Sequence, residues 1–421
     1  MGATVGYTPY TAETLPGRLA LVDVVTDRLG RDTGTWQVRE VGDGNLNLVF
    51  IVSSSQGALV VKQALPYVRL VGDSWPLPLT RSFFEYNALT RHAARDPGRV
   101  PEVHHFDEEQ ALVIMRYLHP HVILRKSIVA GVVHPALAGQ MGCFLARSLF
   151  RGSNLSMPAA QAKSDMAMFA GNGALADITE NLVFSDPYFD AKLNRHTPGL
   201  DPWVLKLRAD RDMKVAAQEM KHAFVSKAET LVHGDLHSGS IMVTKTDTQV
   251  IDPEFAIYGP FGFDIGMLLG NFLLGYFAQS GHETVPGARD DYRRWLLGVV
   301  VETWDCFSTE FSRLWRTERS GILYERSLFA DDPLVEEQAL QSVLTGIWRD
   351  TLGFAGVEMH RRILGLAHVE DLEAIPDPAR RVVAERRALA LGRQLAVMRG
   401  SLLTTAQVCA LADHIETGDL S

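Results

Sequence analysis

The sequence predicts an α+β fold with a β-rich N-terminal part and a mostly helical C-terminal part. Between residues 36 and 115, short apolar segments alternate with turns rich in glycine and asparagine, which is typical of antiparallel strands. After residue 118 the apolar residues recur at helical spacing over longer segments. The predicted helices are residues 135–151, 203–230, 287–316, 334–364 and 378–414. We therefore expect two lobes, residues 1–118 and residues 119–421.

The N-terminal lobe combines predicted strands with two helices. The expected strands are residues 36–41, 48–52, 59–62, 103–106 and 111–115. Residues 8–30 carry an apolar stripe and end at Gly30, so we expect one helix there, with a second over residues 80–92. Glycine and prolines interrupt residues 68–78, which predicts an irregular loop. Trp75 in this loop is either a lid or a side chain that pins the loop to the core.

Composition excludes several classes of partner. The 421 residues are 46% hydrophobic, which is enough for a buried core, and a net charge of −9 argues against nucleic acid or an anionic membrane as partner.

The chain has three widely spaced cysteines, Cys143, Cys306 and Cys409. They form no metal pattern and no even disulfide framework, which predicts a reducing cytoplasm. Residues 265–278 form the most apolar run, but they fall short of the ~20 residues that span a bilayer. We expect them to form a buried core helix. The first residues show no signal-peptide pattern.

The stretch from residue 231 to residue 254 carries the most chemistry. Asp235 lies in a His-Gly-Asp turn before a predicted hairpin, and Asp252 and Glu254 follow its second strand. Like charges are costly to hold together unless a cation lies between them. Carboxylate oxygens suit Mg²⁺, which usually takes one or two carboxylates and completes its shell with water and phosphate. Three carboxylates in this arrangement can hold Mg²⁺, which leaves one acid over as a base.

Two other interpretations fit this stretch less well. His233 and His237 have the i, i+4 spacing of zinc-binding pairs, but that motif needs a helix and a glutamate after the first histidine. Here Gly234 follows His233 and the flanking residues are strand-like, which disfavours zinc. A polar hairpin without chemistry would rarely use two histidines and three acids.

A phosphate-binding role is predicted for residues of the N-terminal lobe. Residues 42–47 form a glycine-containing turn between two strands, where the backbone N–H groups can approach a phosphate tail. Lys62 ends the next strand and can direct a compact positive charge at phosphates. Glu85 on the following helix can pair with Lys62. Taken singly, each residue also fits an ordinary turn, a solvated lysine or a surface glutamate.

Together these parts, in this order, resemble the protein-kinase-like phosphotransferases, which include aminoglycoside, choline and homoserine kinases. Within that group the chain is similar to the 5-methylthioribose kinase family. The segments that carry the resemblance are residues 42–50, 71–77, 233–241, 251–256, 258–264 and 353–356, with Arg361 and Arg362. They span most of the chain in the order of the family, and they imply a protein-kinase-like bilobal fold.

Two positions depart from the broad superfamily. Ser240 stands where that superfamily usually has a metal-binding asparagine, and Glu254 stands where it usually has glycine. The methylthioribose kinases resemble this chain at both positions. Glu254 can return the oxygen ligand that Ser240 does not supply.

The resemblance implies a reaction and its site residues. ATP and 5-methylthioribose would give ADP and 5-methylthioribose 1-phosphate, a step of methionine salvage, with Mg²⁺ as cofactor. Asp235 would receive or orient the proton of the anomeric hydroxyl, and Arg361 and Arg362 would hold the sugar or stabilise phosphoryl charge. The residues implied to contact the nucleotide are Asn47, Lys62, Arg116, Tyr117, Leu118, Asp252, Pro253 and Glu254, with Asp252 and Glu254 on the metal. Without the resemblance, the arginine pair would be assigned to a solvated helix face.

Supporting roles and the remaining partners follow from the same resemblance. The backbone of residues 116–118 would contact the adenine edge, although Arg116 stands where the family commonly has an acidic residue. Asp264 is expected to cap the apolar helix or to brace the catalytic loop, and His233 to fix that loop by hydrogen bonding. His237 is either structural or near the substrate. A cytoplasmic homodimer is also implied.

Two alternatives remain at this point. The chain can be a kinase for another small hydroxyl compound, such as homoserine, choline or an aminoglycoside, and its acidic balance would suit a cationic substrate. It can also be a catalytically inactive kinase-like binding module. The presence of Lys62, Asp235, Asp252 and Glu254 argues against the second alternative.

Overall fold

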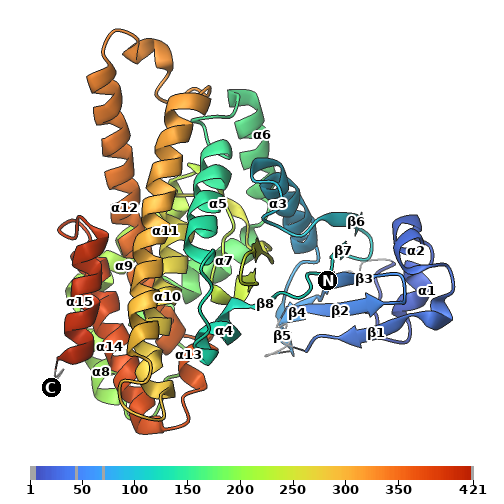
Figure 1. Ribbon diagram of the computed structural model, residues 1–421, viewed down its shortest axis with the longest axis horizontal. Helices are drawn as coiled ribbons and strands as arrows, with labels where there is room; N and C mark the ends of the chain where they lie inside the picture. The colour runs from blue at the N-terminus through green and yellow to red at the C-terminus, as the bar shows by residue number, and fades with distance from the viewer. Residues whose placement is uncertain (1–5, 43–45, 69–71, 419–421) are drawn as a thin grey trace. The chain divides into compact units, whose positions relative to one another are not determined.

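The computed structural model describes residues 6–42, 46–68 and 72–418, with backbone only at residues 72 and 73. The chain divides into two compact units. The first unit contains the described residues up to Pro120 together with Gln249–Ala256, and the second contains His121–Thr248 and the residues from Ile257 onward. The first unit is built on an antiparallel sheet and the second is mostly helical, which confirms the predicted α+β class (Figure 1).

A five-stranded antiparallel sheet forms the centre of the first unit. The strand order is β1-β2-β3-β7-β6, and every neighbouring pair is antiparallel. The bounds are β1 (Gln37–Glu40), β2 (Asn47–Ser53), β3 (Ala58–Ala64), β6 (Val103–Asp107) and β7 (Leu112–Arg116). All five predicted strands are therefore present. The expected second helix, α3 (Arg81–Arg95), lies between β5 (Gly72–Pro76) and β6 in the chain.

Alternation along these strands gives the sheet two different faces. One face carries Phe50, Val52 and Val61, which form a core with leucines and valines of the preceding helices. Side chains alternate along a strand, so Lys62 lies on the opposite face to Val61. Asn47 lies three residues before Phe50 and shares that opposite face. Lys62 and Asn47 are both buried on this second face.

The prediction of one helix over residues 8–30 is wrong. The chain forms two short helices, α1 (Leu15–Leu19) and α2 (Asp23–Leu29), and Val22 between them is extended, with φ −110° and ψ 105°. The residues from Val22 onward are rich in β-branched side chains, which have low helix propensity, so tertiary packing decides the conformation here. Both helices still bury their apolar residues in the sheet core.

The segment around Trp75 is also more regular than predicted. β4 (Tyr67–Val68) pairs antiparallel with β5 (Gly72–Pro76), which contains Trp75. Pro76 ends the strand, a position where its missing N–H is tolerated. Trp75 is half-buried. Residues 69–71 and residues 43–45 of the glycine-containing turn lie outside the described residues.

The second unit consists mainly of helices. Their bounds are α4 (Leu124–Ala130), α5 (Leu137–Arg151), α6 (Ala159–Phe169), α7 (Gly173–Leu182), α8 (Asp201–Ala209), α9 (Arg211–Ser226), α10 (Gly262–His282), α11 (Asp290–Glu318), α12 (Pro333–Leu364), α13 (Glu370–Glu373), α14 (Pro378–Val397) and α15 (Thr405–Thr417). Short strands are β8 (Val122–Ile123), β9 (Thr230–Val232), β10 (Ile241–Val243) and β12 (Ile257–Gly259), while β11 (Thr248–Val250) crosses the boundary between the units.

Two of the predicted long helices are each divided in two. The prediction over residues 203–230 becomes α8 and α9, because Asp210 is extended and its side chain accepts the N–H of Met213 at 3.0 Å as an N-cap. The prediction over residues 378–414 becomes α14 and α15. Thr404 forms a capping box with Gln407 at the start of α15. In both cases a local cap starts a new helix where apolar spacing alone predicts continuity.

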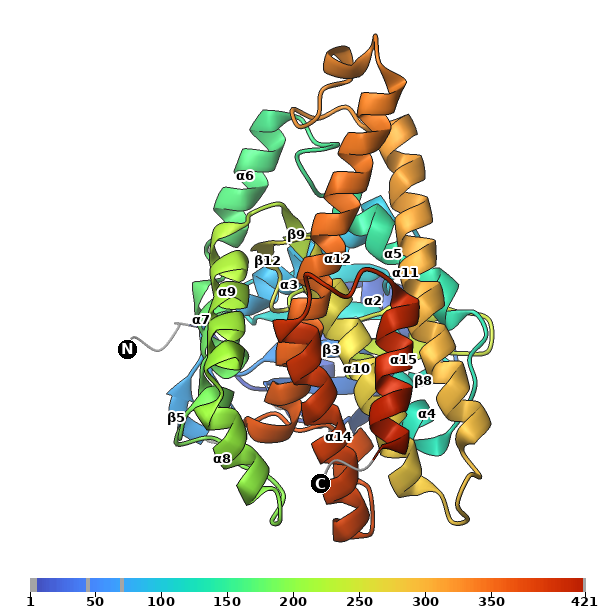
Figure 2. The same ribbon diagram turned by 90° about the vertical axis from the view of Figure 1, so that its left-hand side faces the viewer.

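Helix α10 is the predicted core helix and is buried along almost its whole length. It packs against α11, α12 and α14 (Figures 1 and 2). Gly266 allows the close approach of α12, because a Cβ atom there would lie 2.5 Å from the carbonyl oxygen of Thr351. This tight packing fixes α12, which carries the arginine pair. None of the helices in the described residues combines the length and apolar character needed to span a membrane.

Candidate active site

In the first unit, Lys62 extends from β3 and contacts Glu85 on α3. The Nζ atom of Lys62 lies 2.8 Å from Oε1 of Glu85, so the expected pair is present, and Nζ also donates to Oδ1 of Asp252. Burial lowers the pKa of Lys62, but Asp252, Glu85 and Glu254 outweigh burial and raise it. Burial also raises the pKa of Glu85, against the opposing charge of Lys62. Lys62 therefore remains a cation among carboxylates.

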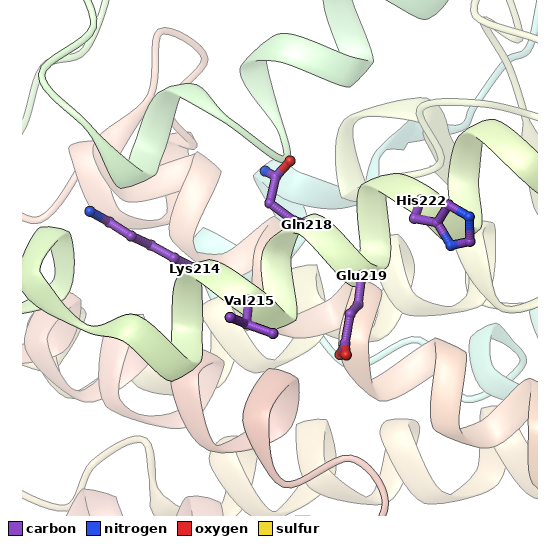
Figure 3. A pocket seen from close by; sticks show the side chains of 5 residues that line it. All are labelled: Lys214, Val215, Gln218, Glu219 and His222. Carbon is purple, nitrogen blue, oxygen red and sulfur yellow. The ribbon is translucent and has the colours of Figure 1, made fainter.

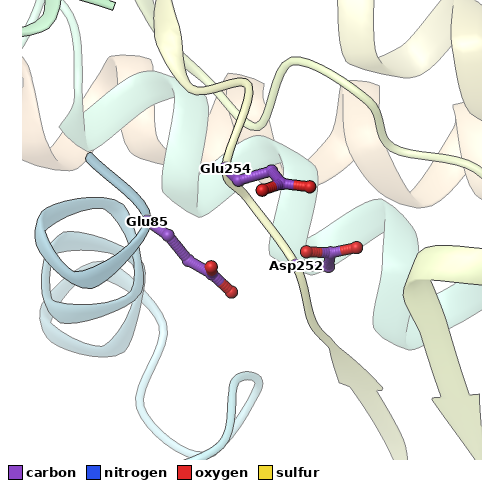
Figure 4. Close-up of side chains that lie close together, drawn as sticks. All are labelled: Glu85, Asp252 and Glu254. Atoms are coloured by element: carbon purple, nitrogen blue, oxygen red, sulfur yellow. The ribbon is translucent and has the colours of Figure 1, made fainter. Parts of the chain in front are cut away.

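Glu85, Asp252 and Glu254 form a cluster of three carboxylates (Figure 4). Each offers one oxygen, and these oxygens all lie within 4.8 Å of one another. Asp252 has φ 68°, the left-handed region that only a few non-glycine residues adopt, aspartate among them. Pro253, between the two predicted metal ligands, is buried. This unusual backbone turn presents two acids of one short segment beside an acid of α3.

The position of Glu254 is fixed by two donors. Its Oε2 atom accepts from Nδ2 of Asn47 at 3.1 Å and from Nε of Arg81 at 3.3 Å. Arg81 is completely buried, and it also donates to the carbonyl oxygens of Leu46 and Leu65. Sequence reasoning identified Asn47 but missed Arg81. One signal was present, since a cation in the first turn of a helix opposes the helix dipole.

The carboxylate cluster fits a hard divalent cation. Mg²⁺ prefers oxygen ligands and takes one or two carboxylates with water and phosphate. Asp252 and Glu254 supply such oxygens close together, and Glu254 is held by hydrogen bonds as metal-binding carboxylates commonly are. Lys62 supplies positive charge in the same cluster. The assignment of Asp252 and Glu254 to the metal remains a prediction that these residues fit.

The connector predicted to contact adenine begins at the end of β7. Arg116 is exposed, Tyr117 stacks on His119 with ring centroids 5.9 Å apart, and Leu118 is buried. The N–H of Arg116 donates to the carbonyl oxygen of Glu102 at 2.9 Å. This N–H group is therefore already hydrogen-bonded within the first unit. The predicted contact with adenine would use backbone groups of Tyr117 and Leu118 instead.

In the second unit, Asp264 holds the loop that carries Asp235. Its carboxylate accepts the N–H of His233 at 2.6 Å and that of Gly234 at 3.1 Å. Asp264 is the third residue of α10 and its carboxylate accepts loop N–H groups, so of the two expected roles it braces the loop. Nδ1 of His233 accepts the N–H of Asp235 at 3.3 Å, and Ser240 donates to the carbonyl oxygen of Asp235 at 3.0 Å. The loop is therefore held on both sides of Asp235.

His237 is engaged within the same loop and does not form a zinc pair with His233. Its Nδ1 accepts the N–H of Gly239 at 2.8 Å, and its Nε2 lies 3.3 Å from Oδ2 of Asp235. Burial lowers the pKa of His237 to about 4, which keeps the ring neutral. In the described part of the chain, neither histidine belongs to a cluster of three metal-binding side chains.

Both predicted arginines reach Asp235. Nη2 of Arg361 lies 2.8 Å and Nη2 of Arg362 lies 3.1 Å from Oδ1 of Asp235. The two arginines are buried, which excludes a solvated helix face. Burial raises the pKa of Asp235, but His237, Arg361 and Arg362 outweigh it and hold the pKa well below its usual value. Asp235 is therefore ionised.

Other residues around Asp235 were missed by sequence reasoning. Arg125 on α4 donates from Nε to Oγ of Ser238 at 3.1 Å, and its Nη2 lies 3.1 Å from Nδ1 of His237. Nε of Arg125 also lies 3.3 Å from Asp371 on α13. Asn271 on α10 and Glu358 on α12 extend this network. A partial signal was available, since Asn271 is a polar residue inside the most apolar run of the chain.

Two surface hollows of the described structure lie away from these residues. One hollow of about 430 Å³ lies along α9 and is lined by Lys214, Val215, Gln218, Glu219 and His222 (Figure 3). A second, of about 460 Å³, is lined by residues of α9 and α12 and of the segment between α14 and α15. Neither contains a predicted site residue. The predicted residues instead form the two polar clusters described above.

The two clusters suit transfer of a phosphoryl group from a nucleotide. A strand lysine held by a helix glutamate, paired acids after a strand and an aspartate in a His-Gly-Asp loop are the parts that kinases use for positioning and charge neutralisation. Residues 37–307 match the family model described as the phosphotransferase enzyme family. The fold and these residues define a kinase-like phosphotransferase.

Curated relatives narrow this class. Methylthioribose kinase 1 of Oryza sativa subsp. japonica is 42% identical over 418 residues, which cover 98% of this chain and 96% of that protein. Methylthioribose kinase of Escherichia coli is 45% identical over 395 residues, which cover 93% of this chain and 94% of that protein. The chain belongs to the methylthioribose kinase family, as its motifs predicted.

Proposed function

We propose that this chain transfers the γ-phosphoryl group of ATP to the anomeric hydroxyl of 5-methylthioribose. The products are ADP and 5-methylthioribose 1-phosphate, in a step of methionine salvage. One observation carries the proposal: Asp235 is ionised and held by the adjacent residues Arg361 and Arg362. Support comes from relatives at 42% and 45% identity that are named methylthioribose kinases.

In this proposal the residues of the first unit bind ATP. Lys62 contacts the phosphates as a compact cation, and Glu85 holds it extended from β3. Asn47 and Arg81 orient Glu254, which acts with Asp252 as the metal-binding pair. Bound Mg²⁺ supplies neutralisation of phosphate charge. Backbone groups of Tyr117 and Leu118 contact the adenine edge, and Trp75 is a lid residue.

Asp235 orients the acceptor hydroxyl in this proposal. A carboxylate whose pKa lies well below the usual value is a weak base, but it is a strong hydrogen-bond acceptor. Phosphoryl transfer needs little covalent help, so alignment of the hydroxyl dominates the contribution of Asp235. Arg361 and Arg362 hold the sugar and stabilise the charge of the transferred group. His237 is a neutral neighbour that hydrogen-bonds to Asp235.

The test is ADP production by the purified protein with ATP and Mg²⁺, with and without 5-methylthioribose. We expect strong stimulation by the sugar that is lost in Asp235→Ala, while nucleotide binding survives. Asp291→Ala is the matched control, because Asp291 is a highly exposed aspartate on α11. Near-normal turnover by Asp235→Ala would contradict the assignment. Stimulation by choline, homoserine or an aminoglycoside instead of the sugar would select the alternative acceptor class.

Location and assembly complete the proposal. We propose a cytoplasmic enzyme, supported by Cys143, Cys306 and Cys409, none of which is in a disulfide bond in the described residues. We propose a homodimer on the resemblance to the methylthioribose kinases. Light scattering of the purified protein at micromolar concentration tests the dimer, and a monomer mass would overturn it.

A further inference from the structure

The arginine pair of α12 presents a geometric problem. Consecutive residues on an α-helix point about 100° apart around the axis. Nevertheless Nη2 of Arg361 and Nη2 of Arg362 both lie near the same oxygen of Asp235, at 2.8 and 3.1 Å. The two cations also repel one another. A further contact is needed to direct both guanidinium groups to one point.

Glu358 makes that contact with both arginines. It precedes Arg361 by three residues and Arg362 by four, and residues at these spacings are neighbours on a helix surface. Its Oε2 lies 2.9 Å from Nε of Arg361, and its Oε1 lies 2.6 Å from Nε of Arg362. Arg362 donates a hydrogen bond from Nε to Glu358, whereas Arg361 forms an ion pair with it, and both arginines use Nη2 for Asp235. The carboxylate lies between the two cations and reduces their repulsion.

Glu358 is itself fixed by a residue of α10. The side chain of Glu358 is completely buried, and its Oε1 accepts from Nδ2 of Asn271 at 2.9 Å. Oδ1 of Asn271 accepts from Nη2 of Arg125 at 3.2 Å. Arg125 in turn donates to Ser238, in the loop that carries Asp235. This ring of contacts gives a reason for an asparagine within the most apolar helix of the chain.

We infer that Glu358 is a positioning residue that directs Arg361 and Arg362 onto Asp235. The inference rests on the proposed function, because the arginines act on the acceptor and on the transferred group. Glu358 needs no contact with either substrate for this role. Misplacement of a positioning group by about 1 Å can cost on the order of 100-fold in rate. We expect an effect of that size on kcat/KM for 5-methylthioribose, with KM for ATP unchanged.

Glu358→Gln tests this role, and Glu310→Gln is its matched control. Glutamine keeps the shape but loses the negative charge and one of the two oxygens, so it no longer faces each arginine with an anionic oxygen. Glu310 on α11 also holds two arginines, with Nε of Arg147 at 2.7 Å and Nε of Arg313 at 2.8 Å. We expect both variants to lose thermal stability and only Glu358→Gln to lose kcat/KM. Unchanged kinetics in Glu358→Gln would overturn the inference.

A double-mutant comparison separates positioning from general damage. In a chain that already carries Arg361→Gln and Arg362→Gln, Glu358→Gln should lower kcat/KM little further, because its targets are absent. An equal, independent loss in that background would overturn the inference. If Glu358→Gln does not fold, Glu358→Asp takes its place in the test. Aspartate keeps the negative charge, but its side chain is one methylene shorter. We expect it to retain more activity than any uncharged variant that folds.

Crystal structures of the wild-type protein and of Glu358→Gln, both without substrate, decide the geometry independently of activity. We expect at least one arginine to leave Asp235 in the variant. Retention of both contacts would overturn the inference, even if the protein phosphorylates another acceptor. Conversely, a wild-type protein without sugar-stimulated ADP release refutes the proposed function alone, while the two structures still test Glu358.

Discussion

Replacement of Lys62 by methionine tests whether this lysine is the cation that holds the carboxylate cluster together. The side chain of Glu85 is 3% exposed and that of Asp252 is 45% exposed, so solvent screens only the second pair. Removing one partner of a buried pair costs about 3–5 kcal/mol, whereas an exposed pair contributes about 0–1 kcal/mol. We expect Lys62→Met to lower the free energy of unfolding by about 3 kcal/mol near neutral pH without divalent cations.

The size of this loss should depend on pH. Burial raises the pKa of Glu85, and Lys62 opposes that increase, so its removal raises the folded-state pKa further. A group with a raised folded-state pKa stabilises the protein below its unfolded pKa, and this contribution is lost as the pH rises through the folded value. Lys62→Met should therefore approach the wild type at about pH 4 and fall behind it towards about pH 7.5.

Urea denaturation at both pH values measures the effect. The matched variant combines Lys62→Met with Glu85→Gln and so removes the buried charge together with its partner. We expect it to recover most of the lost stability but not the turnover, because the lysine is still missing. Two outcomes would refute the reasoning. One is that Lys62→Met is as stable as the wild type near neutral pH, and the other is that the variant with both substitutions is no more stable than Lys62→Met alone.

Three further predictions concern the second unit. Asp264→Asn keeps one acceptor for the two loop N–H groups, so kcat should fall about 10-fold or more while ATP affinity holds, as initial-rate kinetics can show. Gly266→Val places side-chain atoms too close to the carbonyl oxygen of Thr351. It should lower the free energy of unfolding, measured by thermal denaturation, by about 1–3 kcal/mol or more. His237, with its pKa lowered to about 4, favours the folded state above about pH 6.5, and this stability is lost as the pH falls towards 4. His237→Asn should flatten the dependence of the unfolding midpoint on pH between these values.

Local pattern determined much of this protein. The period of two in the strands, the period of 3.6 in the helices and the turn residues between them predicted the α+β class and all five strands of the main sheet. The order of motifs identified the family, because the glycine-containing turn, the lysine, the paired acids and the arginine pair are residue types at fixed places in the chain. The sequence left open whether Lys62 pairs with Glu85, and the structure shows this contact.

Local pattern failed where packing or capping decided the conformation. Residues 8–30 carry a continuous apolar stripe, but the chain bends at Val22 to place two short helices on the sheet. Residues 72–76 contain breakers, but they pair as a strand with Tyr67 and Val68. Asp210 begins a new helix within a predicted one. In each case a cap or a tertiary contact overrides the local pattern.

Only the tertiary structure showed which residues hold the predicted ones in place. Arg81 reaches Glu254 from 173 residues away, and Arg125 reaches Ser238 from 113 residues away. Glu358 is close in sequence to the arginines, but its role depends on the side of α12 that Asp235 and Asn271 occupy. Sequence spacing predicts which side chains share a face of one element. It does not predict which elements meet, since that depends on close packing such as the contact of Gly266 with α12.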